Sequence, residues 1–362
     1  MDRDGRSDLV ICTECGPVKI FRNDRGRLAE IRSTGIENIH GLFGSISPGD
    51  VDNDGDLDFV IGNMGTNSSW VATDQQPVKL RYGNFGNEDS SNRIIASYRS
   101  GNKELPIRSF DALSPWVSLE SDFESSETFA RSDMDEIFGD KLDQSLTVSI
   151  NELRSGVIIN QTVGENIKFE FRPLPLICQS SPIRGCQLCD VNGDGFLDVY
   201  VLQNEDAVHP LDEKTTAGKS LLLLGQGDGN FKLHSRETGL FVPGIGKALC
   251  VVDLNQDARA DFVTAEKNSK LRFFLNQSGH APFAFDIKRI SGGKQFIGTT
   301  VKIDFEDGSE QLHQIHCGAG YISQSPPIIY SGLNLNSEIK QITITWPDGT
   351  RKSGTVKSLF NK

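Results

Sequence analysis

Long apolar runs are absent from this sequence. No stretch of about 18 apolar residues occurs in its 362 residues, so we expect no membrane-spanning helix. Basic residues are in the minority, because 37 Lys and Arg stand against 49 Asp and Glu and give a formal net charge of −12. An acidic surface repels phosphate backbones, so we expect no nucleic-acid partner. The first residues, Met1 to Asp4, also lack the basic and apolar segments of a signal peptide.

Cysteine and histidine are too scattered to define a site. The seven cysteines include two C-x-x-C pairs, Cys12–Cys15 and Cys186–Cys189, a spacing that suits zinc or redox chemistry. No His or Cys follows at zinc-ribbon spacing, and we favour the interpretation of small buried apolar residues. The odd count argues against a complete disulfide framework, although one or two bridges are compatible with it. Of the six histidines, His313 and His316 would face opposite sides of an alternating strand.

An acidic nine-residue pattern recurs along a chain whose 36 glycines suit a turn-rich β protein. Residues 50–58 read D-x-D-x-D-G-x-x-D, residues 190–198 and 253–261 repeat it with substitutions, and residues 2–8 hold its later part. A worn copy lies at 84–92, with most of its acids gone. Each clear copy leads into a short β-rich run that is typical of a buried strand. Three full copies at matched offsets argue against chance Asp/Gly turns.

The spacing of this pattern brings together oxygens for a hard cation. Ca²⁺ takes roughly six to eight oxygen ligands, and alternate residues of a tight loop can point at one centre. We predict side-chain ligands at positions 1, 3, 5 and 9 and a backbone carbonyl ligand at position 7. Position 6 needs a positive φ for the sharp turn, which explains Gly5, Gly55 and Gly195. The predicted calcium ligands are Asp50, Asp52, Asp54, Asp56 and Asp58; Asp190, Asn192, Asp194, Phe196 and Asp198; Asp253, Asn255, Asp257, Arg259 and Asp261; and Asp2, Asp4, Arg6 and Asp8.

These loops are not EF-hands, and they are not equivalent. An EF-hand needs Glu at position 12 and flanking helices, whereas position 12 is Ile61 in the first full loop and Val201 in the second. The second loop has Asn192 in place of one acid, and the third has Ala258 where glycine is expected, so we expect weaker binding there. The four loops carry 14 aspartates, a crowding of like charge that is unfavourable unless a cation fills the centre.

Two further regions differ from the repeats. From about 109 to 139 the pattern turns helical and acidic, which indicates an insert with a solvated surface. From about Gly298 onward, alternating runs with D-G turns at Asp307-Gly308 and Asp348-Gly349 indicate a small β domain. We predict that the aromatic residues of the insert form an exposed recognition surface or, alternatively, pin the insert to a repeat. These residues are Phe110, Trp116, Phe123 and Phe129.

The repeated loops resemble FG-GAP or VCBS repeats, the units of integrin-α-like β-propellers. The tail, with Gly320-Tyr321 followed by Trp346-Pro347-Asp348-Gly349, is similar to the ASPIC/UnbV domain that follows such repeats in cartilage acidic protein and its bacterial relatives. The resemblance implies an all-β chain with propeller repeats over 1–290, a helical insert and an ASPIC/UnbV-like domain over 291–362. Because the chain begins inside a repeat, we expect upstream blades and any signal peptide to lie outside this sequence. Whether the blades close into a complete propeller is not decided by the sequence.

The resemblance implies a calcium-binding module, extracellular or at the cell surface, that adheres to a protein or glycan and has no enzymatic activity. A polysaccharide-acting hydrolase or lyase, or its accessory subunit, is the alternative, since propellers can host such enzymes. An intracellular scaffold is a third possibility, which only the missing signal peptide and free thiols favour. We interpret the histidines as buried or surface residues, because none lies near a recognisable nucleophile motif.

Overall fold

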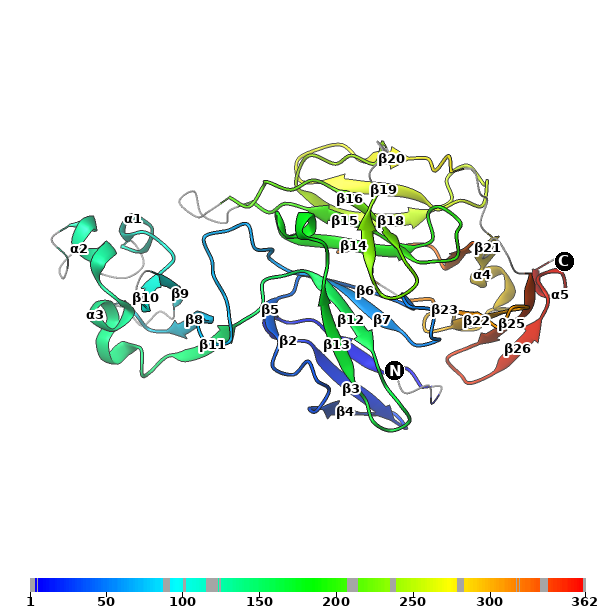
Figure 1. The fold of residues 1–362 in the computed structure, drawn as a ribbon, viewed down its shortest axis with the longest axis horizontal. Helices are drawn as coiled ribbons and strands as arrows, with labels where there is room; N and C mark the ends of the chain where they lie inside the picture. Colours follow the sequence, from blue (N-terminus) through cyan, green and yellow to red (C-terminus); the bar gives the residue numbers. More distant parts are fainter. Residues whose placement is uncertain are drawn as a thin grey trace.

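The computed structural model shows an all-β chain, as predicted, with every named pair of strands antiparallel (Figure 1). The structure describes residues 4, 6–86, 92–99, 102–114, 123, 125–206, 214–234, 239–278, 283–316, 318, 320–332 and 338–360.

Four successive sheets repeat the plan of a propeller blade. The second sheet contains β6 (Ser45–Gly49), β7 (Asp58–Gly62), β12 (Gly156–Asn160) and β13 (Phe169–Pro173). The third contains β14 (Ile183–Cys189), β15 (Asp198–Gln203), β16 (Leu221–Gly225) and β17 (Phe231–Leu233). The fourth contains β18 (Gly246–Val252), β19 (Asp261–Glu266) and β20 (Arg272–Phe274). The first contains β1 (Leu9–Ile11), β3 (Lys19–Asp24) and β4 (Arg27–Ile31), and beside it β2 (Glu14–Pro17) pairs with β5 (His40–Leu42).

The inner strands of neighbouring sheets lie side by side, and the core fills the space between sheets. Strand β14 contacts both β6 and β18. The Leu188 amide donates to Ser47 Oγ at 3.2 Å, which joins two inner strands. Apolar residues on β12, β15 and β16, such as Ile159, Val199 and Leu223, form one buried cluster. Strands buried on both faces require continuous apolar runs, and the β15 sequence Val-Tyr-Val-Leu meets that requirement.

An insert separates β7 from β12. It has its own sheet and projects at one end of the molecule (Figure 1). Its strands are β8 (Val78–Gly83), β9 (Asn92–Arg99), β10 (Lys103–Pro106) and β11 (Leu146–Ile150). Its helices, which fall in the predicted helical region, are α1 (Phe110–Leu113), α2 (Ser126–Arg131), α3 (Met134–Phe138) and the 3-10 turn η1 (Gly139–Lys141). A second 3-10 turn, η2 (Leu176–Gln179), follows β13. The worn repeat copy at 84–92 joins β8 to β9, and its residues 87–91 lie outside the described residues.

Phe129 belongs to the core of the insert, and the half-buried Phe110 and Phe123 pack against it, so the prediction that these three rings make an exposed recognition surface is wrong. Phe129 is only 4% exposed, and both Phe110 and Phe123 meet its ring edge-on at centroid distances of 5.5 Å. They pack with Phe85 in the same cluster, on the insert's own sheet. Sequence alone did not reveal this, because β8 to β10 supply the surface that the rings cover. Trp116 lies outside the described residues.

The C-terminal region forms a separate sheet against the repeats (Figure 1). Its strand order is β23 (Glu310–Gln314), β22 (Thr300–Phe305), β25 (Ile339–Thr345) and β26 (Arg351–Gly354). Strand β21 (Phe283–Asp286) pairs with β24 (Ile328–Ser331), and the short helices are α4 (Ile287–Ile290) and α5 (Val356–Phe360). The predicted hairpin is present, with β22 paired to β23 and Gly308 at φ 86° in its turn.

Strand β23 brings His313 and His316 to the inner strands of the repeats. Both line one cavity of about 80 Å³, together with Pro48, Cys189 and Tyr330. Strand β23 ends at Gln314, so His316 lies just beyond it, and the cavity lining includes every residue from Leu312 to His316. That the two histidines face opposite sides therefore stays a prediction. Burial lowers the pKa of His313 to about 4, so this side chain is neutral at physiological pH.

Candidate metal centre

The three full acidic loops join the first and second strands of their sheets, at β6–β7, β14–β15 and β18–β19. Position 6 has a left-handed backbone in each loop, as predicted: φ is 83° at Gly55, 90° at Gly195 and 67° at Ala258. Position 4 is left-handed as well, which the pattern did not indicate, with φ of 57° at Asn53 and 75° at Gly193. Two such residues fold each loop back on itself. Ala258 therefore adopts a conformation that an L side chain disfavours.

The first aspartate of each loop holds the turn together. Asp50 Oδ1 accepts the Asp54 amide at 3.1 Å, and its Oδ2 accepts the Gly55 amide at 3.1 Å. Asp190 accepts the amides of Gly193 and Gly195 at 2.7 and 2.9 Å. Asp253 accepts those of Asp257 and Ala258 in the same way. This carboxylate therefore orients the loop whether or not a cation is bound.

The ninth residue is a fully buried brace between strands. Asp58 Oδ2 accepts the Val51 amide at 2.9 Å, and its Oδ1 accepts the Asn160 amide at 2.7 Å from the end of β12. Asp198 and Asp261 repeat this arrangement, and all three are 0% exposed. Each oxygen keeps a second lone pair. Position 9 can therefore brace the sheet and ligate a metal ion at once.

Sequence reasoning missed the residue that meets this brace. It is Asn23, Asn160, Gly225 or Asn276, each at or near the end of the strand that pairs with the strand after the loop. Its amide donates to the position 9 aspartate, which is Asp8 in the case of Asn23. The three asparagines also accept an amide two or three residues ahead, which turns the chain at the end of the strand. The recurrence of Asn after an apolar strand was the available signal.

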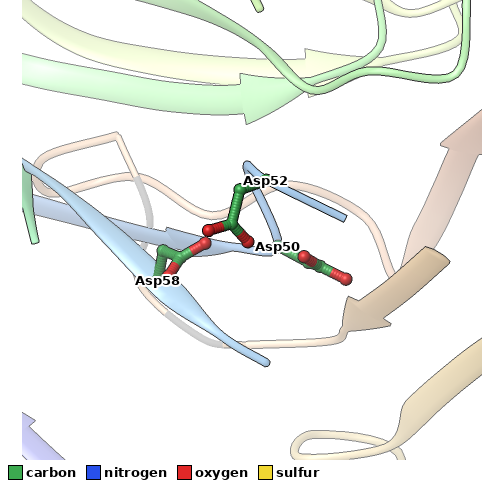
Figure 2. A group of neighbouring side chains, drawn as sticks. All are labelled: Asp50, Asp52 and Asp58. Atoms are coloured by element: carbon green, nitrogen blue, oxygen red, sulfur yellow. The ribbon is translucent and has the colours of Figure 1, made fainter. Parts of the chain in front are cut away.

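The first full loop brings three carboxylates to one point. One oxygen from each of Asp50, Asp52 and Asp58 lies within 4.8 Å of the others, the one such group found among the described residues. Figure 2 shows Asp52 and Asp58 turned toward one another, with Asp50 beside them. Asp52 Oδ1 is buried and has no hydrogen-bond partner there. A buried carboxylate oxygen without a donor is costly, so this group fits a bound cation.

Burial also raises the pKa of the loop aspartates. It raises the pKa of Asp50 to about 7, and the neighbouring Asp54 charge adds to the shift. It raises the pKa of Asp58 and of Asp198 to about 8, and that of Asp190 to about 6. Without a counter-charge, Asp58 and Asp198 therefore hold a proton at neutral pH and Asp50 is partly protonated, and a cation that binds these groups must displace those protons.

The other loops are less suited to a cation. In the second loop, the Asn192 amide group donates to Asp194 Oδ2 at 2.8 Å. In the third, Arg259 forms an ion pair with Asp257 at 3.0 Å. The pKa of Asp257 is lowered because hydrogen bonds from Asn255 and Arg259 outweigh its desolvation. A guanidinium thus supplies positive charge at this loop, which gives a second reason, besides the strain at Ala258, to expect weak binding there.

The remaining predicted ligands lie as follows. Asp54 is exposed and its Oδ1 accepts the Asp56 amide at 2.8 Å, whereas Asp56 is 4% exposed. Phe196 donates its amide to Asp194 Oδ1 at 2.9 Å. In the incomplete loop at residues 2–8, Asp4 forms an ion pair with Arg6, and Asp8 accepts the Asn23 amide. Asp2 lies outside the described residues.

The cysteines form no second site in the described part of the chain. The six described cysteines are free thiols, and Cys317 is outside those residues. Cys178, Cys186 and Cys189 are buried, and burial raises the pKa of Cys186 to about 11. Protonated, buried thiols agree with the interpretation as small apolar residues.

Comparison with protein families gives the class of the chain. Residues 1–61 and 190–264 match the FG-GAP-like repeat, and residues 291–357 match the ASPIC and UnbV domain. The chain is therefore an FG-GAP-like repeat protein with a C-terminal ASPIC/UnbV domain. The first match covers the four acidic loops, and the insert lies outside both matches. No curated protein matches the chain. None of the described helices is long and apolar enough to cross a membrane.

Proposed function

We propose that the chain is a calcium-binding module that acts outside the cell or at its surface by binding another macromolecule. The observation that carries the calcium assignment is the group of Asp50, Asp52 and Asp58, with its unpartnered buried oxygen. Carboxylates and backbone carbonyls are hard oxygen donors, which suit Ca²⁺ better than softer metals. The ion would fix the turn between β6 and β7, and its role would be structural.

Calcium titration tests this proposal. We expect isothermal titration calorimetry to show binding by the wild-type chain and a rise in melting temperature over the chelator-treated protein. At a calcium concentration tenfold above Kd, one site adds about 1.4 kcal/mol to the free energy of unfolding. Asp52→Asn keeps the shape of the side chain but removes the charged oxygen, so it should weaken the tightest site at least tenfold. Asp143→Asn, at an exposed position in the insert, is the matched control. Equal melting temperatures with chelator and with calcium would refute calcium binding.

A groove at the fourth sheet supports a protein as the partner. Strand β20 pairs with β19 and, within the described ranges, with no strand on its other side. Beside it lies a groove of about 780 Å³ lined by Leu222, Leu224 and Phe262 and by the exposed Phe273 and Leu275. Exposed apolar surface next to an unpaired strand edge suits the addition of an extended peptide.

The second and third sheets indicate which side chain such a peptide must have. Their fourth strands begin with Phe169 and Phe231, each opposite the residue that donates to the position 9 aspartate. Phe231 packs in one cluster with Val157 and Ile159 of the preceding sheet. Phe169 does the same with Ile20. The groove at the fourth sheet is the equivalent gap, so an added strand would place an aromatic residue opposite Asn276.

A peptide of residues 226–234, which contains Phe231, is the probe for this groove. We expect fluorescence anisotropy to detect its binding to the wild-type chain. Binding should be lost with the Phe231→Ala peptide and with the Phe273→Asp protein, and kept by Val163→Asp, which changes a residue that is 78% exposed elsewhere. Equal binding of the two peptides would refute the proposal that the groove is the peptide-binding site. Steady turnover on a panel of polysaccharides would instead favour the alternative enzymatic function.

A further inference from the structure

The C-terminal domain donates hydrogen bonds to the first aspartates of two metal loops. The Leu312 amide on β23 donates to Asp50 Oδ2 at 3.2 Å. The Gly332 amide, just after β24, donates to Asp190 Oδ2 at 2.6 Å. These aspartates precede their donors by 262 and 142 residues. Both loops thus contact one domain, and each contact ends on a carboxylate predicted to ligate calcium.

The contact at the second loop is closely fitted. Gln311 Nε2 donates to the Gly195 carbonyl at 2.8 Å, and Ser331 Oγ donates to Gln311 Oε1 and holds that side chain in place. Gln311 is 5% exposed. A Cβ atom on Gly332 would overlap the Gly193 backbone and Asp190 Oδ2, so only glycine allows this approach. Gly193 and Gly195 are the two left-handed residues that shape the loop.

The third loop provides an internal comparison. Asp253 accepts amides from its own loop at 3.1 and 2.9 Å, and among the hydrogen bonds of the described residues it accepts none from the C-terminal domain. It is half-buried, whereas Asp50 and Asp190 are both 1% exposed. The domain therefore covers two of the three full loops.

We propose that Gln311 and Gly332 are positioning residues for calcium binding, so that calcium and the docked C-terminal domain stabilise each other. This inference rests on the proposed calcium binding. In Asp50 and in Asp190, Oδ2 accepts both an amide of its own loop and an amide of the C-terminal domain, so the domain helps to hold the carboxylate in the orientation that the loop gives it. Calcium in turn neutralises carboxylates that the docked domain keeps away from water. Linkage is reciprocal, so whatever weakens one binding event weakens the other by the same factor.

Two substitutions with matched controls test the positioning role. Gly332→Ala and Gln311→Ala should each lower calcium affinity at the second loop by about tenfold, the usual effect of removing a partner of a metal-binding group. Gly185→Ala is the control for the first, because its Cβ would meet its nearest neighbour at an ordinary 3.4 Å. Gln314→Ala, on the same strand, is the control for the second.

Hydrogen exchange during a calcium titration reports each loop separately. We expect protection of residues 190–198 to need about tenfold more calcium in both variants, while residues 253–261 respond as in the wild type. In the wild type, calcium should also slow exchange at β23 and β24. Unchanged affinity at 190–198 in variants of a calcium-binding wild type would overturn the coupling alone. A wild type that binds calcium but shows no calcium response at 190–198 would also overturn the coupling alone, and a wild type that binds no calcium would overturn the proposed function and the coupling together.

Discussion

Replacing Asp58 by alanine should destabilise the protein even when no metal is present. Asp58 is 0% exposed and accepts the amides of Val51 and Asn160 at 2.9 and 2.7 Å. Alanine removes both acceptors and leaves two buried N–H groups unpaired. Each unpaired group costs about 1–3 kcal/mol. Removing a carboxyl group that burial disfavours offsets part of this cost. We therefore expect a net loss of about 2–4 kcal/mol, a large part of the stability of a typical domain.

Asp54→Ala is the comparison that separates bracing from metal binding. Asp54 is exposed, and its Oδ1 accepts one amide within its own loop, from Asp56. Its loss should cost less than about 1 kcal/mol in chelator, because hydrogen bonds of an exposed side chain compete with water. It should nevertheless reduce the rise in stability that calcium gives the wild type.

Urea unfolding in chelator, followed by circular dichroism at pH 8.5, measures both effects. The expected order of midpoints in chelator is wild type, then Asp54→Ala slightly lower, then Asp58→Ala clearly lower. If Asp58→Ala unfolds at the wild-type midpoint with the same denaturant dependence, the brace contributes nothing and our account of position 9 is wrong.

Three further predictions concern the loops and the insert. Burial raises the pKa of Asp50, Asp58, Asp190 and Asp198 to between about 6 and 8, whereas an unfolded aspartate titrates near 3.8, so the metal-free protein should lose stability as the pH rises from about 4 to about 8. The calcium-induced rise in melting temperature should therefore be larger at pH 8 than at pH 5, and equal shifts would contradict the raised pKa values. Ala258→Gly should raise the unfolding free energy in chelator by about 0.5–1 kcal/mol, because glycine accepts φ 67° without strain; a lower melting temperature would oppose this. Phe129→Ala should destabilise the insert by about 3–5 kcal/mol and speed its hydrogen exchange without changing calcium affinity, and an unaffected insert would show that its rings are not its core.

Much of this protein could be predicted from its sequence. The acidic pattern specifies a turn whose glycines need a positive φ and whose next residues form a strand, and both are local properties. Residues 55, 195 and 258 accordingly have left-handed backbones, and the strands follow where the pattern put them. The all-β class and the family also followed from these short segments and from the Trp346 motif of the tail.

What needed the tertiary structure depends on contacts between residues far apart in the chain. The brace between Asp58 and Asn160 spans 102 residues, so no local pattern indicates that position 9 supports the sheet. Three rings of the insert looked available for recognition until the structure showed that Phe129 is buried and that Phe110 and Phe123 pack against its cluster. The fit of Gly332 against the loop at Asp190 depends on two domains meeting, because only the docked arrangement leaves no room for a Cβ atom there.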